Sequence, residues 1–290
     1  MIKVCIISPA SHLEQYSSLG DCEMVLSHLV LPDEGFHHTD FVKQNYVKYY
    51  KEQTKKGRWT ILDNSAYEIG KLEAKQATGK GLGPDIVLRA AEIINPSIVI
   101  AQDVLCDRDQ TYLATKDFIK YVKSKGLLNK FKIMAVPQGK TSSEWLSSYE
   151  ELMMLPEVDQ VGFSKISVPL SFGDDQISNN CVSLARLKCT QMVEDTFGEM
   201  CKQAHLLGGD NSLPWELSIQ KKHNWIFSND SSACVWYGAH GQRFNKDGKI
   251  DNIITIKPDL ENNNVDTVDL LNKYSETIID NIKTLVDISK

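Results

Sequence analysis

The chain of 290 residues has no long hydrophobic run. No stretch approaches the ~20 consecutive apolar residues that a membrane-spanning helix needs, so we expect no membrane partner. The apolar stretch at residues 1–7 is too short and abrupt for a signal peptide, and it instead predicts a first β-strand. We therefore expect a cytoplasmic protein.

The usual cysteine signatures are also missing. The seven cysteines are odd in number, scattered, and contain no Cys-x-x-Cys pair. Cys181 and Cys189 are eight positions apart, and His205 and His223 lie in different segments, so nothing predicts a structural zinc site. Scattered cysteines within apolar segments indicate a reduced protein with packed thiols. We expect neither a bound metal nor a cofactor.

A general excess of positive charge is lacking too. The net charge of −6 argues against a protein that coats nucleic acid without specificity. Charge is nevertheless uneven, because residues 43–80 hold nine Lys or Arg against four acids, and residues 116–132 hold six Lys against one. These segments are either solvated helix faces or a local rim that contacts phosphates, and the sequence leaves both readings open.

What the chain does have is a regular alternation of strand and helix patterns. Helical patterns begin at Asp40, Pro84, Asp107 or Asp109, and Ser142, and another covers residues 181–201. Strands are predicted near residues 3–8, 24–30, 59–63, 97–102, 131–137, 158–163, 203–208 and 225–229. Eight strands in such an alternation predict an α/β fold, a (β/α)8 TIM-type barrel formed by residues 1–290 as a single domain. A doubly wound sheet is the alternative, but no Gly-x-Gly-x-x-Gly follows the first strand.

Two regions interrupt the alternation. Residues 71–83 are rich in Gly and Lys and predict a long loop, and long loops in compact domains are often lids. Residues 241–267 form an irregular insertion, within which Asp247-Gly248 indicates a hairpin. Apolar residues at helical spacing over 266–288 predict a C-terminal helix that packs against the barrel.

Polar residues follow several of the predicted strands. Asp63, Asp103, Gln138 and Asp230 each come at or just after the end of an apolar run. Because the carboxyl ends of barrel strands converge on one mouth, we expect these side chains to share a site. The alternative for each single residue is a helix N-cap, where Asp and Asn are favoured.

Five short stretches, in order, resemble a known family. Residues 63–68 resemble the Asp-Ser-Gly-Gly-Phe-Gln stretch of tRNA-guanine transglycosylases and the Asp-Ser-Gly-Ala-Phe variants of relatives that insert 7-deazaguanines into DNA. Residues 98–103 resemble the strand that ends in a base-recognising Asp, and residues 136–139 the Gln-Gly motif. Residues 161–164 stand where the family has its Gly-Gly turn, and residues 227–232 where it has a nucleophilic Asp.

The resemblance covers about residues 60–240 and has informative departures. The Cys-x-Cys-x-x-Cys and His of the family's zinc subdomain are missing, which makes the chain most similar to the DNA-acting relatives without that subdomain. Ser65-Ala66 replaces the first Gly-Gly pair, so we expect a bulkier pocket floor.

The resemblance implies roles for individual residues. Asp230 is expected as nucleophile or ion-pair partner and Asp63 as acid/base, since two carboxyls in different protonation states suit cleavage of a base–sugar bond. The expected base-binding residues are Asp103, Gln138, Gly162, Ser164 and Tyr67. The expected phosphate or proton-shuttle contacts are Gly208, Gly209 and His240.

The leading hypothesis is therefore cleavage of the N-glycosidic bond of an unusual base in nucleic acid, with DNA favoured over tRNA. Entry of water gives base excision, whereas attack by a second free base gives exchange. One alternative is a metal-assisted hydrolase with Asp63, Asp103 and Asp230 as ligands, although no His-x-His lies at a strand end. Another is a non-catalytic nucleic-acid-binding barrel. The sequence leaves a homodimer open.

Overall fold

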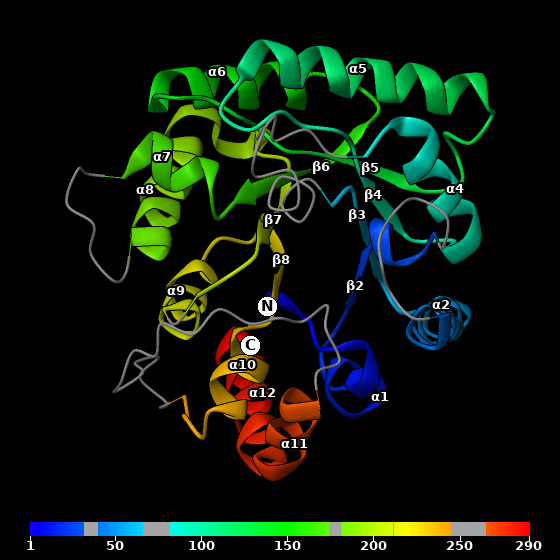
Figure 1. Ribbon diagram of the computed structural model, residues 1–290. Helices are drawn as coiled ribbons and strands as arrows, with labels where there is room; N and C mark the ends of the chain where they lie inside the picture. The colour runs from blue at the N-terminus through cyan, green and yellow to red at the C-terminus, as the bar shows by residue number, and fades with distance from the viewer. Residues whose placement is uncertain (32–39, 66–81, 174–180, 211, 245–264) are drawn as a thin grey trace.

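The eight predicted strands form one parallel sheet that closes almost completely into a barrel (Figure 1). The computed structural model describes residues 1–31, 40–65, 82–173, 181–210, 212–244 and 265–290. Strand order around the sheet is β1-β8-β7-β6-β5-β4-β3-β2. The bounds are β1 Lys3–Ile6, β2 Glu23–Leu26, β3 Thr60–Asp63, β4 Ile98–Ile100, β5 Lys132–Ala135, β6 Val158–Ser164, β7 Gln203–Leu207 and β8 Ile226–Ser231. The (β/α)8 prediction is confirmed, and the doubly wound alternative is wrong.

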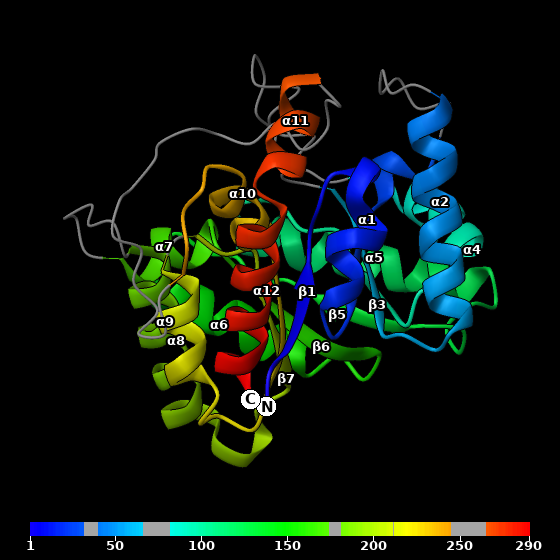
Figure 2. The same ribbon diagram turned by 90° about the horizontal axis from the view of Figure 1, so that it is seen from below.

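Helices surround the barrel on its outside (Figures 1 and 2). The bounds are α1 Leu13–Tyr16, α2 Asp40–Lys55, α4 Pro84–Ile94, α5 Arg108–Ser124, α6 Ser142–Met153, α7 Ser167–Phe172, α8 Cys181–Phe197, α9 Leu213–Gln220, α10 Ala233–Ala239, α11 Val265–Lys273 and α12 Ser275–Ser289. Short 3-10 turns lie at Ala10–His12, Ser17–Leu19, Ser27–Leu29 and Gly198–Met200. None of the helices in the described ranges is long and apolar enough to cross a membrane.

Side-chain caps explain where two of these helices begin. The Asp107 carboxylate accepts a hydrogen bond from the Gln110 N–H at 2.9 Å, which selects Asp107 over Asp109 as the start of α5. The Thr141 hydroxyl accepts from the Glu144 N–H, and the Glu144 carboxylate reaches back to the Lys140 N–H at 2.9 Å. Reciprocal bonds of this kind satisfy donors that the first helical turn leaves unpaired.

The strands divide the apolar residues between two cores. Successive residues of a strand point to opposite faces, so one set fills the barrel and the other packs under the helices. The inner core consists of Cys5, Cys22, Met24, Ile61, Ile98, Ile100, Met134 and Val136. In the outer core, Trp145 of α6 packs edge-on against Phe163 of β6 with ring centroids 5.0 Å apart.

Aromatic rings and lysines fill the barrel at the amino ends of the strands. Trp59 and Phe227 meet edge to face at 5.4 Å. The Lys3 Nζ lies 4.9 Å from the Phe227 ring centroid, and the Lys132 Nζ lies 5.5 Å from that of Trp59. Cation–π contacts of this kind stabilise a packed end. A functional site is therefore expected at the opposite, carboxyl end of the barrel.

Closure between β1 and β2 relies on few bonds. The Val4 carbonyl accepts from the Asp21 N–H at 2.7 Å, and the Asp21 carboxylate accepts from the Val4 N–H at 3.1 Å. A Cys5–Cys22 disulfide joins the two segments, with their Cα atoms 4.7 Å apart. The expectation of a chain with only reduced thiols is therefore wrong for this pair. Barrel closure brings together two cysteines that are 17 residues apart, which spacing alone does not reveal.

The C-terminal segment forms two helices, where the sequence predicted one. The chain breaks at Tyr274 between α11 and α12. Helix α12 lies beside β1, and the Ile2 N–H donates to the Ser289 carbonyl at 3.0 Å, so the two ends of the chain meet (Figure 2). Most of the predicted 71–83 loop and of the 241–267 insertion, including the Asp247-Gly248 hairpin, lies outside the described residues.

We expect reduction of the Cys5–Cys22 disulfide to lower the free energy of unfolding by about 3 kcal/mol. The cross-link closes a loop in the unfolded chain and so restricts its conformations, and the magnitude follows from the length of that loop. Chemical denaturation with and without reductant measures the change, with Cys22→Ser as the matching variant and Cys106→Ser, a free thiol, as control. Alkylation of the denatured protein should modify two more thiols after reduction than before. Equal counts would contradict the disulfide.

Candidate active site

The predicted polar residues gather at the carboxyl ends of the strands. Asp63 is the last residue of β3, Asp103 follows β4, and Gln138 follows β5. Ser164 ends β6, and Asp230 is the penultimate residue of β8. Parallel strands bring these positions to one end of the barrel, as the sequence predicted. Tyr67, expected to contact the base, lies outside the described residues.

Asp230 is held through one of its carboxylate oxygens. Its Oδ1 accepts from His205 Nε2 at 2.9 Å and from the Gly208 N–H at 2.8 Å. Its Oδ2 accepts no hydrogen bond from any residue that the structure describes. The residue is 5% exposed, so the carboxylate borders the barrel mouth without being fully solvated. One oxygen is thus fixed, while the other is left open to a further contact.

His205 is the residue beneath Asp230 inside the barrel, and it is fully buried. An ionised carboxylate can only accept, so Nε2 of the imidazole must carry the proton that it shares with Asp230. The ring's other nitrogen, Nδ1, lies 2.7 Å from the Ser228 hydroxyl, which can donate to it or accept from it. Both ring nitrogens are therefore engaged, and this fixes the ring orientation beneath Asp230.

Gly208 has a backbone conformation that suits glycine. Its φ is +69°, and a Cβ built there would lie 2.5 Å from the Lys165 Cδ. Gly209 is also enclosed, because its Cβ would lie 2.7 Å from the Leu213 Cδ2. The tight turn directs the Gly208 N–H toward Asp230. Gly208 was expected as a phosphate or proton-shuttle contact, and in this structure its amide binds a carboxylate.

Asp103 is held by two side-chain amides. Asn64 Nδ2 donates to Oδ1 at 3.0 Å, and Gln138 Nε2 donates to Oδ2 at 2.7 Å. Burial raises the pKa of Asp103 from 3.8 to about 6, and the two amide donors oppose this rise. The carboxyl is therefore able to carry and release a proton near neutral pH.

Gln138 supports Asp103 from a fully buried position. Besides the bond to Asp103, its Oε1 accepts from the Cys106 N–H at 3.0 Å. Cys106 has a positive φ of 59°, so the turn after β4 is fixed by this bond. The expectation that Gln138 touches a base is untested, and its observed contacts position Asp103.

Asp63 belongs to a turn that includes Ser65. The Asp63 carboxylate accepts from the Ser65 N–H at 3.1 Å, and its carbonyl accepts from the Ser27 hydroxyl. Ser65 is buried with a φ of +58°, and its hydroxyl lies 2.9 Å from His28 Nδ1. A non-glycine residue in this conformation is uncommon and is held here by its contacts.

The remaining predicted residues have structural contacts. A Cβ at Gly162 would meet the Leu207 Cδ1 at 2.7 Å, so a larger residue at this position inside the barrel would have to displace the Leu207 side chain. The Ser164 hydroxyl accepts from the Ile166 and Ser167 N–H groups and shapes the turn into α7. His240 Nδ1 is bonded to the Trp236 carbonyl of its own helix, and none of its contacts joins it to Asp230.

Three residues that position the site were missing from the sequence-based set. His205 gave a signal, since it is a polar residue between Ala204 and Leu206 within a predicted strand. Asn64 lies next to a predicted aspartate, but its contact with Asp103 depends on the neighbouring strand. Arg186, described below, lies in a helix far from any motif and gave no signal.

Among the described residues, no three His, Cys, Asp or Glu side chains lie close enough together to hold a metal ion. Asp63, Asp103 and Asp230 are all described, so they do not form the ligand set that the metal-assisted alternative requires.

The basic stretch on α5 makes local contacts. Lys116 and Lys125 lie over the rings of Tyr112 and Tyr121 at 5.0 and 5.3 Å, and Lys123 pairs with Glu157. A solvated helix face makes contacts of this kind, and they do not test the phosphate-contacting rim.

Comparison with known proteins assigns no family. No protein-family model and no curated protein matches the chain. Among solved structures, protein CitE from Mycobacterium tuberculosis, in complex with magnesium and acetate, aligns over 79% of this chain and 85% of its own, with 9% identity and a TM-score of 0.42. A likeness at that level carries no argument about function.

The raised pKa of Asp103 predicts how the free energy of unfolding depends on pH. The folded state retains the Asp103 proton more strongly, so the contribution of Asp103 to stability is most favourable below pH 3.8 and falls as pH rises to about 6. Since one pKa unit is worth about 1.4 kcal/mol, Asp103 should lower the unfolding free energy by about 3 kcal/mol over this range. Denaturation of wild type and Asp103→Asn between pH 3.5 and 7.5 gives the difference. A constant difference across that range would refute the assignment.

Proposed function

We propose that this chain cleaves the N-glycosidic bond of a modified base in nucleic acid, with DNA the favoured substrate. The observation that supports this proposal is that two carboxyls at one barrel mouth lie in different environments. Asp103 is buried with a pKa raised to about 6, whereas Asp230 is held by two N–H donors with one oxygen open. Carboxyls that differ in this way suit the two tasks of glycosidic cleavage.

Asp230 provides the negative charge. As the bond between sugar carbon and base nitrogen breaks, positive charge develops at the sugar. The open Oδ2 of Asp230 stabilises that charge or bonds to the carbon, while His205 and Gly208 keep Oδ1 in place. The bonding electrons leave with the base.

Asp103 provides the proton. The departing nitrogen gains the electron pair of the broken bond and takes a proton from Asp103, whose pKa allows it to carry one near pH 6. Water, or a second base, then attacks the sugar carbon, and where Asp230 has bonded to that carbon this bond breaks and returns its electrons to the carboxylate. The attacking group gives its own proton to Asp63 at the end of the adjacent strand. Asp63 thus keeps the acid/base role that the sequence predicted, and in this proposal Asp103 shares that role.

The resemblance over residues 60–240 supports a base in nucleic acid as the leaving group. A base inside a duplex has to leave its stack before a pocket of this kind can bind it, and an unusual base gives that step selectivity. Whether the product is an abasic site or an exchanged base depends on the second attacking group.

Asp230→Asn is the decisive variant. It keeps the side-chain shape and should reduce base release at least 100-fold, since the developing charge loses its partner. Free base and abasic sugar are measured by mass spectrometry after incubation with DNA and RNA that carry ordinary or hypermodified bases.

The control is Asp195→Asn, an exposed aspartate on α8, which should release base at the wild-type rate. Release that persists in Asp230→Asn would contradict the proposal. Binding of oligonucleotides without release by wild type would favour the non-catalytic barrel.

A further inference from the structure

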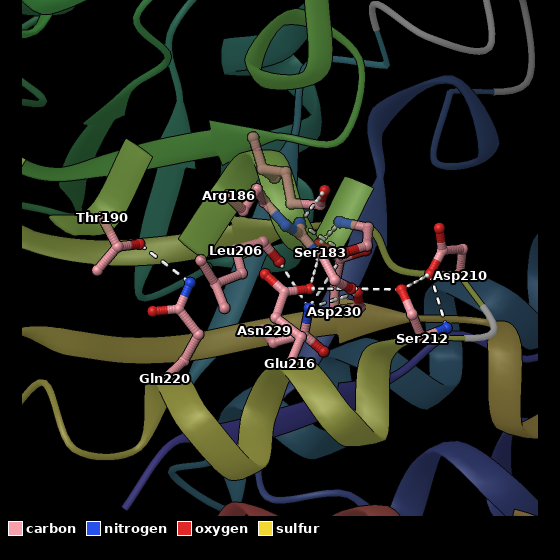
Figure 3. A network of polar contacts seen from close by, with 12 residues as sticks. Ser183, Arg186, Thr190, Leu206, Asp210, Ser212, Glu216, Gln220, Asn229 and Asp230 are labelled. Carbon is pink, nitrogen blue, oxygen red and sulfur yellow. Dashed lines mark hydrogen bonds and ion pairs between the residues drawn. The ribbon is translucent and has the colours of Figure 1, made fainter. Parts of the chain in front are cut away.

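A fully buried arginine lies behind the residue that binds Asp230. Arg186 extends from α8 toward the end of β7 (Figure 3). Its Nη1 donates to the Leu207 carbonyl at 3.0 Å and to the Gly208 carbonyl at 2.9 Å. Its Nη2 donates to the Glu216 carboxylate at 2.6 Å. The guanidinium therefore donates hydrogen bonds to two consecutive backbone carbonyls.

The first of these carbonyls belongs to the same peptide group as the Gly208 N–H. The chain contains no cis peptide bond among the described residues, so the Leu207 C=O and the Gly208 N–H point in opposite directions. Arg186 Nη1 and the Lys165 N–H, at 3.1 Å, both donate to the oxygen on one side of this planar group. The N–H on its other side reaches Asp230 Oδ1 at 2.8 Å. Fixing one end of the peptide fixes the other.

The arginine is itself anchored by a buried network. Glu216 of α9 also accepts from the Ser183 hydroxyl at 3.2 Å, and Ser183 shares a hydrogen bond with Ser212 (Figure 3). The Ser212 hydroxyl and N–H both bond to the Asp210 carboxylate, at 2.6 and 2.8 Å. The network connects α8 and α9 to the turn after β7.

Stability alone is a weak reason to bury such a pair. Arg186 and Glu216 are both fully buried, and the cost of removing two charges from water often equals what their attraction returns. Such a pair is better explained where it holds something in a defined position. Here it holds the turn at Gly208, whose φ is +69°. Glycine adopts many backbone conformations, so this turn needs other contacts to fix it.

We propose that Arg186 is a positioning residue for Asp230 and acts through the Leu207–Gly208 peptide; this rests on the proposed function. By donating to the Leu207 carbonyl, the guanidinium polarises the peptide and strengthens its N–H as a donor. It also prevents the peptide from rotating away from the carboxylate. Asn229 assists, since its Nδ2 donates to the Gly208 carbonyl at 3.2 Å.

The first readout is independent of activity. In the NMR spectrum of the full chain, the Gly208 amide proton should lie downfield and should move upfield in Asp230→Asn, which removes its charged acceptor. Arg186→Gln should move the same resonance upfield, and Arg186→Lys should move it less because one charged donor remains. Arg108→Gln is the control, since Arg108 pairs with Glu151 at the surface and should leave the resonance unchanged.

The second readout is the pH dependence of base release. Arg186→Gln should lower kcat about 10- to 100-fold, as for other groups that orient a catalytic side chain, with little change in KM. As the pH is lowered, the Arg186→Gln variant should also lose activity at a higher pH than wild type does. The reason is that a carboxylate with a weaker donor binds a proton more readily. Arg186→Lys should recover part of both changes.

Defined results overturn the inference. An unchanged Gly208 resonance in a folded Arg186→Gln variant would mean that Arg186 serves only packing. If that variant does not fold, Arg186→Lys decides, and a wild-type amide position together with a wild-type pH profile would refute the role. If wild type releases no base, the proposed function fails, while the amide shifts still decide whether Arg186 positions the peptide.

Discussion

A carboxylate buried in a barrel must be hydrogen-bonded, and the site is arranged around that requirement at Asp230. The charge is compensated by His205 from within the barrel and by the Gly208 N–H from the turn after β7. Each donor is then fixed by a further contact, with Ser228 on the imidazole and Arg186 on the peptide. Only one oxygen of the carboxylate is used in this way. The two donors that compensate the charge both bind Oδ1, and the proposed chemistry uses the other oxygen, Oδ2.

The two ends of the barrel differ for the same physical reason. At the amino ends of the strands, the rings of Trp59 and Phe227 and the lysines above them fill the interior. At the carboxyl ends, aspartates and amides replace apolar residues. Asp103 shows the consequence, since burial raises its pKa to about 6 although Asn64 and Gln138 both donate to it. A carboxyl that can carry a proton is thus placed at the same mouth as Asp230.

Much of the fold was predictable because it is encoded locally. Alternating strand and helix patterns gave eight strands within a few residues of their observed bounds. They also gave Asp107 or Asp109 as the start of a helix, and Asp107 is its N-cap. The aspartates at strand ends were found for the same reason, since their place follows from the strands. The Cys5–Cys22 disulfide depends on which strands meet when the barrel closes, so the expectation of reduced thiols failed there.

Contacts between distant segments set the limits of the sequence analysis. The contacts of Gln138 were not predicted, because its partners lie 35 and 32 residues away and only the folded barrel brings them together; its expected contact with a base stays a prediction. Arg186 reaches its carbonyls from a helix that no motif marks. The break at Tyr274 has no helix-breaking residue beside it, and the apolar spacing continues across it, so one helix was predicted where two occur.

The most direct test of the account is an NMR titration of the aspartate carboxyl carbons. The Asp103 resonance is identified by its loss in Asp103→Asn and followed between pH 3 and 8 in the full chain. The account predicts a midpoint of about 6, which gives the barrel mouth a carboxyl that holds a proton near neutral pH. A midpoint near the ordinary value of 3.8 would leave Asp103 ionised near neutral pH and would contradict its part in the proposed chemistry.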